Sequence, residues 1–473
     1  MNFATVKYLL FIVFVFAIYW RLSRKKQNLF LLLASYFFYA SWDWRFLSLI
    51  IISTVTDYFS GLLIFDSNSP GRRKLVLIIS LIINLSILGY FKYFNFFAGS
   101  LVALADTIGW HVSWTVAKII LPVGISFYTF QSISYTVDIY RGQLKPTKSF
   151  IDFAAFVAFF PQLVAGPIVR AKEFVFQLET KRHFSAENLQ QGLTRFMLGF
   201  FKKAIIADTL AVHLVDQAFA DPTSYTSGTL WLALLGWSIQ IYADFSGYSS
   251  MAIGSAKILG FDVPENFRFP YLSWNISQYW QRWHMTMSRF FRDYVYIGLG
   301  GNRKGVARSM VNIAITTFVS GLWHGAGWTF VCWGWLHGFY IITFQIWRAW
   351  RQKLGKWNKN PGFPGVVPGW VLTMLAVSLS RILFRSPNFS TAWEYTKGLF
   401  GSGGESVIDF PSIIWICFGA IVIDHIAGWF IQYRPGLEKR IPAVATAIFY
   451  AVLFIFVYYS YPQNVIPYVY FQF

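Results

Sequence analysis

The sequence is dominated by apolar runs that are long enough to cross a lipid bilayer. A membrane-spanning helix needs about 20 mostly apolar residues, and such runs recur along most of the chain. A helix satisfies its own backbone hydrogen bonds in lipid, so the pattern predicts an all-α, polytopic membrane protein with about 11–13 membrane helices. The predicted spans are 3–20, 28–42, 46–65, 74–97, 117–138, 150–166, 192–218, 228–257, 309–323, 327–347, 367–386, 411–431 and 441–460.

Three segments do not fit a simple span. The short run 150–166 could be re-entrant, and the charged segment 170–190 is interpreted as an amphipathic stretch at the membrane interface. The glycine-containing segment 387–410 is predicted to be an extracytoplasmic loop. No linker rich in Pro, Gly or Ser and no internal repeat divides the sequence, so we predict one integral-membrane domain over residues 1–473.

Charge separates this chain from soluble and nucleic-acid-binding proteins. Charged residues make up 13% of the sequence, against about 25% in soluble domains. The net charge is +19, but the basic residues form short clusters between apolar runs, as the positive-inside rule predicts. Nucleic acid is therefore not an expected partner, whereas membrane lipids are. With only two cysteines, both in apolar runs, neither a disulfide framework nor a metal site is expected.

The basic clusters also predict the orientation. The first cluster, Arg21 to Lys26, follows the first apolar run, so that loop should be cytoplasmic and the N-terminus extracytoplasmic. A secretory signal peptide has its positive residues before the apolar run, so we interpret this run as a retained membrane helix.

One histidine is placed where chemistry is expected. His324 lies in SGLWHGAGWTFVCWGWLHG, residues 320–338, among glycines and aromatic residues. Sixteen residues separate it from Arg308, or about 24 Å of helix, which places it inside the membrane profile. Ionisable residues at that depth are costly and are functional candidates. A helix break here would put the imidazole in a cavity, although a hydrogen-bonded structural histidine remains the alternative.

A second polar and aromatic stretch covers residues 264–305. It is too polar for a simple span, and it could line a cavity as a re-entrant segment or lie on the headgroups as a cytoplasmic loop. Its ionisable candidates are Arg282, His284, Arg289, Arg292 and Asp293. Two shorter segments, 239–254 with Asp244 and Tyr248, and 160–174 with Arg170, also place polar groups among apolar ones.

Taken together, these segments resemble the membrane-bound O-acyltransferase family, in its bacterial alginate O-acetyltransferase membrane-subunit-like branch. The matching strings are VGISFYTFQSISY (123–135), PQLVAGPI (161–168), YADFSGYSSMAIG (242–254), NFRFPYLSWNISQYWQRWHMTMSRFFRDYVYIGLGGNRKG (266–305), GLWHGAGWTFVCWGWLHG (321–338) and PYVYFQF (467–473). Members that act on peptidoglycan, cellulose and teichoic acid are relatives in the same family.

The resemblance implies a helical ring with a central tunnel, and it implies roles for two histidines. His324 matches the principal catalytic histidine, and His284 matches the second. A histidine can take the proton of an acceptor hydroxyl or carry the acyl group itself, and the sequence leaves both open for His324. We expect His284 to orient or polarise the thioester. Further candidates for binding the donor or substrate are Arg282, Arg289, Arg292, Asp293, Trp323, Asp244 and Tyr248.

The implied function is a relay of acetyl groups across the bacterial inner membrane. The expected donor is acetyl-CoA, used as a substrate with no tightly bound cofactor, and the expected acceptor is an extracytoplasmic polysaccharide such as alginate, peptidoglycan or cellulose. The resemblance also implies an extracytoplasmic SGNH-hydrolase-like partner. A D-alanyl or lipid O-acyltransferase of the same family is one alternative. A transporter with proton-relay histidines is another, but the inverted repeats and paired intramembrane carboxylates that it predicts are not evident.

Overall fold

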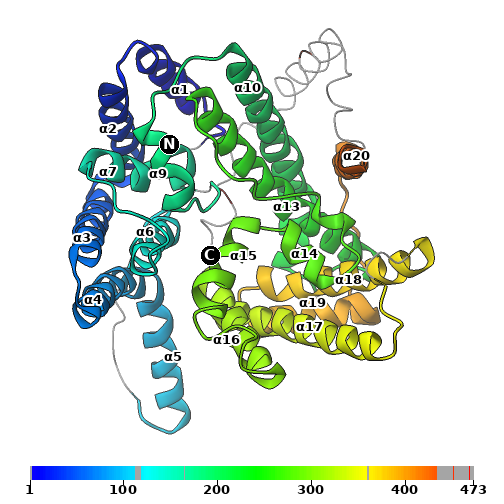
Figure 1. Cartoon of the computed structure of the whole chain (residues 1–473). Coiled ribbons are helices and arrows are strands. Elements are labelled where there is room, and N and C mark those ends of the chain that lie inside the picture. Colours follow the sequence, from blue (N-terminus) through cyan, green and yellow to red (C-terminus); the bar gives the residue numbers. More distant parts are fainter. Residues whose placement is uncertain are drawn as a thin grey trace. The chain divides into compact units, whose positions relative to one another are not determined.

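The fold is all-helical in the part of the chain that the structure describes. The computed structural model describes residues 3–111, 119–164, 166–358, 362–433, 451 and 468. Within these residues the ordered elements are helices and helical turns, and the pairing of Tyr225 with Ser406 is an isolated bridge. The all-α prediction is therefore confirmed (Figure 1).

The chain forms two compact units. The first comprises residues 1–196 and 251–264, and the second comprises residues 197–250 and 265–473. Two long helices, α10 (Ala186–Phe201) and α13 (Ser227–Ile258), contribute residues to both units. The interpretation of the whole chain as one domain stays a prediction.

The first unit contains the N-terminal helices. In it α2 packs against α7, and α3 packs against α4 and α6. The bounds are α1 (Val6–Tyr19), α2 (Arg24–Asp43), α3 (Leu47–Asp66), α4 (Pro70–Leu88), α5 (Phe94–Thr107), α6 (Ile125–Tyr140), α7 (Phe150–Ala158), α8 (Phe160–Leu163) and α9 (Ala171–Glu179).

The second unit contains the helices that carry both histidine motifs. Besides the end of α10 and most of α13, its bounds are α11 (Asp208–Leu210), α12 (Asp216–Ala220), α14 (Ile276–Arg282), α15 (Met285–Phe290), α16 (Val306–His324), α17 (Trp328–Lys353), α18 (Phe363–Arg385), α19 (Phe389–Lys397) and α20 (Ile413–Tyr433). Figure 1 shows α16 and α17 side by side, and α17 also packs against α18.

Four described segments are long and apolar enough to span a membrane. They are Arg24–Asp66, Pro70–Thr107, Pro364–Arg385 and Ile413–Gln432, and α1 is a shorter apolar helix. The other predicted spans from 150–166 to 327–347 also coincide with helices, although 150–166 is divided into the short α7 and α8. Of the predicted span 117–138, residues 117 and 118 lie outside the described residues, and the helix α6 begins at Ile125. The predicted span 441–460 lies outside the described residues apart from Ala451. The segment 387–410 is not a simple loop, because it contains α19.

Close backbone contact brings α16 and α17 together. A Cβ atom added to Gly334 would lie 2.4 Å from the carbonyl oxygen of Thr317 and 2.9 Å from Cα of Gly321. Small residues of this kind let membrane helices approach closely. This contact joins the last turns of α16, just before the break at His324, to the first half of α17, and it holds the two helices at a fixed separation.

Candidate active site

His324 is the last residue of α16, at a break in the chain. Gly325 ends α16, α17 begins at Trp328, and Gly325 and Gly327 both have extended backbone. A Cβ atom on Gly325 would lie 2.3 Å from the ring of Phe330, so a larger residue here would displace that ring. The predicted helix break is confirmed, and the His324 side chain is buried.

Aromatic rings surround the His324 imidazole. Its ring centroid lies 4.9 Å from that of Trp333, 5.0 Å from that of Trp323 and 5.4 Å from that of Phe384, all in edge-to-face geometry. Tight packing by three large rings fixes the orientation of the imidazole.

A small cavity adjoins this imidazole, as the helix break predicted. Its volume is about 10 Å³, which is room for about one water molecule. The lining residues are Ile241, Tyr279, Trp283, His324, Trp333, His337, Val377, Arg381 and Phe384. The cavity therefore gathers three groups that can bind a polar substrate, His324, His337 and Arg381, within an otherwise apolar and aromatic wall.

His337 presents an unprotonated nitrogen near this cavity. Its Nε2 lies 3.0 Å from Oγ of Ser380, whose hydroxyl donates to the carbonyl oxygen of Val377 at 2.7 Å. Because that hydroxyl proton is already used, Ser380 accepts from His337 and the imidazole proton lies on Nε2. The other nitrogen, Nδ1, has no hydrogen-bond partner among the described residues.

Arg381 brings a buried positive charge to the same cavity. The side chain lies on α18 and is 4% exposed. Its Nη2 donates to the hydroxyl of Tyr279 at 3.0 Å, and its guanidinium carbon lies 5.1 Å from the ring centroid of Trp283. No described carboxylate forms an ion pair with it, so neutral and aromatic groups hold the charge.

His284 lies between α14 and α15, outside the four long apolar segments. It is fully buried and has left-handed backbone, with φ of 42°, a conformation that is costly for a residue other than glycine. The ring packs against Phe245 at 4.6 Å and against Trp323 at 5.8 Å between centroids. Trp323 therefore lies against both candidate histidines, His284 and His324.

Asn266 determines which nitrogen of His284 carries the proton. Oδ1 of Asn266 accepts from the backbone N–H of Thr286 at 3.3 Å, and Nδ1 of His284 lies 3.0 Å from the same oxygen. Because a backbone N–H can only donate, the amide oxygen faces His284, and Nδ1 donates to it. Burial lowers the pKa of His284 to about 3, so the ring is neutral. Its Nε2 is then an acceptor, and it has no hydrogen-bond partner in the described part of the chain.

Asp244 and Tyr248 of α13 lie in a buried charged cluster and do not line the His324 cavity. Nζ of Lys203 is 2.8 Å from Oδ1 of Asp244 and 2.6 Å from Oδ1 of Asp208, and it lies 5.7 Å from the ring centroid of Tyr248. The same helix supplies Phe245, which contacts His284. The segment thus contacts the site through Phe245, and the substrate-binding roles of Asp244 and Tyr248 stay predictions. Tyr468, the one described residue of the predicted motif 467–473, packs on Tyr248 at 4.5 Å.

The four charged candidates of 282–293 are also not among the cavity-lining residues. Arg282 donates to Gln432 at 3.1 Å, and Arg292 is exposed and pairs with its neighbour Asp293 at 2.7 Å. Arg289 is partly buried on α15. Their binding of donor phosphates stays a hypothesis. No group of three or more His, Cys, Asp or Glu side chains that could hold a metal occurs in the described ranges.

Comparison with known proteins shows what kind of site this is. The profile of the membrane-bound O-acyltransferase family matches residues 11–384. The chain belongs to this family. It is 42% identical to the probable alginate O-acetylase of Pseudomonas aeruginosa, over 92% of this chain and 83% of that protein. It is 38% identical to the peptidoglycan O-acetyltransferase of Helicobacter pylori, over 80% of this chain and 75% of that protein. The teichoic acid D-alanyltransferase of Bacillus subtilis is 30% identical over 50% of this chain.

The chain is therefore a membrane-bound O-acyltransferase. Two polar groups of its cavity were missed from the sequence. His337 stands in the quoted motif, 13 residues after His324, but a single histidine on a helix gives no sign of its neighbours. Arg381 is a charge inside the predicted span 367–386, and that signal alone marks it as a functional candidate.

Proposed function

We propose that this acyltransferase moves acetyl groups from cytoplasmic acetyl-CoA towards hydroxyl groups of an extracytoplasmic polysaccharide. The observation that supports this best is the cavity that places His324, His337 and Arg381 together. The relatives that act on alginate and on peptidoglycan support acetyl as the group and a polysaccharide as the acceptor. We place the enzyme in the bacterial inner membrane with its N-terminus outside, working with an extracytoplasmic SGNH-hydrolase-like partner.

The proposed chemistry needs one proton acceptor and one cation. The acceptor oxygen attacks the thioester carbonyl carbon, the new C–O bond forms, and the C–S bond breaks. His324 takes the hydroxyl proton and returns it to the departing thiolate. Arg381 stabilises the negative charge that develops on the carbonyl oxygen. If His324 carries the acetyl group itself, the same events occur in two steps. The cavity of about 10 Å³ admits an acyl group only when lining side chains move.

The donor can be tested with the purified full-length protein in lipid nanodiscs. We expect release of free CoA from acetyl-CoA, and a higher rate when a hydroxyl acceptor is added. The D-alanyltransferase relative supports a second candidate donor, a D-alanyl thioester on a carrier protein. Turnover of that thioester without any turnover of acetyl-CoA would overturn the acetyl assignment.

We propose that Asn266 positions His284 so that Nε2 accepts a hydrogen bond from the substrate. Asn266→Leu removes the acceptor that fixes the ring, and we expect activity to fall by up to about 10²-fold. Asn266→Asp keeps an oxygen there, so activity should largely return. Its carboxylate favours protonated His284 and raises the histidine's pKa. Because His284 must be neutral to accept, the acid limb of the pH–rate profile should move to higher pH.

Ser249 provides the matched control for Asn266. Its Oγ accepts from Nδ2 of Asn266 at 3.1 Å, on the side of the amide away from His284. Ser249→Ala should therefore lower activity less than Asn266→Leu and leave the pH–rate profile in place. Equal activity for Asn266→Leu and the unmodified enzyme would refute the positioning role. The same conclusion would follow from an unshifted acid limb in Asn266→Asp.

A further inference from the structure

A second cavity, in the first unit, has the features of an anion site. Its volume is about 480 Å³, within the range of small-molecule sites. It lies where the N-terminus of α2 meets the segment that follows α9. The lining residues are Leu22, Ser23, Arg24, Gln27, Glu179, Lys181 and Arg182. Three of them are cationic and one is a carboxylate.

The N-terminus of α2 at this cavity is unusually positive. The N-cap residue, Ser23, makes no capping hydrogen bond with its side chain, and the first turn has no acidic residue. It has instead Arg24, Lys25 and Lys26. A helix N-terminus carries about half a positive charge, and it favours acidic groups. Three cations there repel one another, and a bound anion would accept the free backbone N–H groups and relieve the repulsion.

Arg182 provides a second and independent observation. It is 9% exposed, and its guanidinium donates to neutral groups, among them Tyr19, Asn28 and the carbonyl oxygen of Gln177. It forms no ion pair with any residue in the described ranges; Asn28 stands between it and Asp152, to which Asn28 donates at 2.7 Å. A buried charge without an ionic partner is costly.

Two of the contacts of Arg182 are weak enough to be exchanged. Its distances to Oε1 of Gln27 and to the carbonyl oxygen of Thr180 are 3.4 and 3.5 Å, long for hydrogen bonds. Arg24 uses only Nη1, for the carbonyl oxygens of Leu178 and Glu179. Each N–H group of Arg182 thus has a neutral acceptor, and an anion in the cavity would replace the two distant ones. Arg24 has further N–H groups, on Nε and Nη2, beyond the Nη1 group that it uses.

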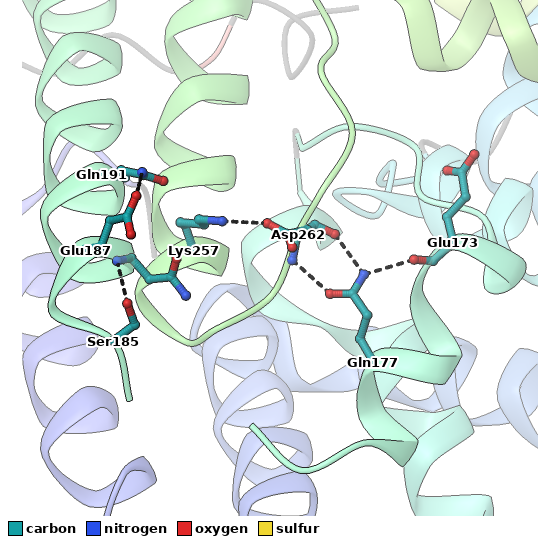
Figure 2. A network of polar contacts seen from close by, with 8 residues as sticks. Glu173, Gln177, Ser185, Glu187, Gln191, Lys257 and Asp262 are labelled. Atoms are coloured by element: carbon teal, nitrogen blue, oxygen red, sulfur yellow. Dashed lines mark hydrogen bonds and ion pairs between the residues drawn. The ribbon is translucent and has the colours of Figure 1, made fainter. Parts of the chain in front are cut away.

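The wall formed by the end of α9 is held in place. Gln177 exchanges two hydrogen bonds with the backbone of Asp262, at 2.8 and 3.0 Å, and the Asp262 carboxylate pairs with Lys257 at 2.7 Å. Figure 2 shows this network, with Gln177 also bonded to the carbonyl oxygen of Glu173. The cavity is thus built between an anchored helix end and the start of α2.

We propose that this cavity binds a phosphate group, and that the phosphate belongs to the headgroup of an anionic membrane lipid. Phosphate oxygens match the guanidinium groups, the Ser23 hydroxyl and the helix N-terminus. The neighbouring aromatic residues favour a lipid over a soluble phosphate ester. Trp20 and the half-exposed Phe184 lie 5.7 Å apart between ring centroids, and tryptophan side chains such as that of Trp20 gather at the membrane interface.

The sharpest test is Ser23→Asp. Aspartate is a good N-cap residue and its charge suits the start of a helix, so folding should be preserved, but its carboxylate would repel a phosphate. The matched control is Ser69→Asp at the N-cap of α4. That residue is also followed by basic residues, but its side chain already caps the helix by accepting from Arg72. A third variant, Lys181→Ala, removes an exposed positive charge that lines the cavity and leaves the N-terminus of α2 unchanged.

Binding is measured on the full-length protein in detergent, by native mass spectrometry and by the rise in Tm on adding lipid. We expect phosphatidylglycerol to be retained in preference to phosphatidylcholine, with affinity reduced at least tenfold in Ser23→Asp, reduced less in Lys181→Ala, and unchanged in Ser69→Asp. The proposal would be overturned if the protein retained both lipids equally. It would also be overturned if Ser23→Asp retained phosphatidylglycerol as well as the unmodified protein does. If inorganic phosphate or CoA bound, the lipid did not, and Ser23→Asp weakened that binding, the assignment to a lipid would be overturned.

Discussion

His324→Ala should reduce acetyl transfer by about 10²–10⁴-fold, the usual contribution of a positioned general base. The substitution removes the imidazole that three aromatic rings hold beside the cavity. The helix break should persist, because Gly325 and Gly327 adopt its extended backbone. The measurement is CoA release and acetyl transfer in nanodiscs, with size-exclusion elution to check folding. His213→Ala is the matched control, since His213 is exposed and lies outside the cavity. Full transfer by His324→Ala would remove His324 from the mechanism.

Two further measurements distinguish how His324 acts. In the His324→Ala protein, added imidazole should restore part of the activity, because the removed ring leaves a space of its own size next to the cavity. Radiolabelled acetyl-CoA supplied without an acceptor should label the unmodified protein only if His324 carries the acetyl group. Rescue without labelling would indicate direct transfer with His324 as the base.

The sequence predicts the elements of this site better than their assembly. The break at His324 was predictable because glycines flank the histidine and restrict what can stand there. The polarity of 264–305 also showed that this segment is not a simple span, but not that it folds into short helices. The helix α19 was missed because the glycines at 401, 403 and 404 dominate that segment, although Asn388 caps the helix by accepting from Thr391.

What the sequence could not provide is contact across elements. His337 and Arg381 reach the cavity only because α17 packs against both α16 and α18. Nothing in the sequence around either residue predicts this packing of helices. Asp244 shows the opposite case. An acidic residue within an apolar span indicated a substrate-binding role, which stays a prediction, but its ion pair with Lys203 was not foreseen. Lys203 lies on a π-helical turn, a local feature that apolar periodicity does not reveal.

Arg381→Met should lower acetyl transfer by about 10²–10³-fold, the cost of losing one group that stabilises an oxyanion. The guanidinium lines the cavity beside His324, and the described residues give it no carboxylate partner. Because a buried cation without an ionic partner opposes folding, its removal should leave the protein at least as stable. Activity and stability should therefore change in opposite directions, which is the pattern expected for a residue kept for function.

Arg381→Lys and Arg385→Met complete this test. Lysine keeps the charge but lacks the planar fork that donates to Tyr279 while stacking on Trp283, so partial activity is expected. Arg385 lies on the same helix, pairs with Asp216 at 2.7 Å and does not line the cavity. Its replacement should leave turnover unchanged. CoA release gives the rate, and thermal unfolding in detergent gives the stability. If Arg381→Met loses stability and activity together, the guanidinium is structural and the cavity must stabilise the oxyanion with another group.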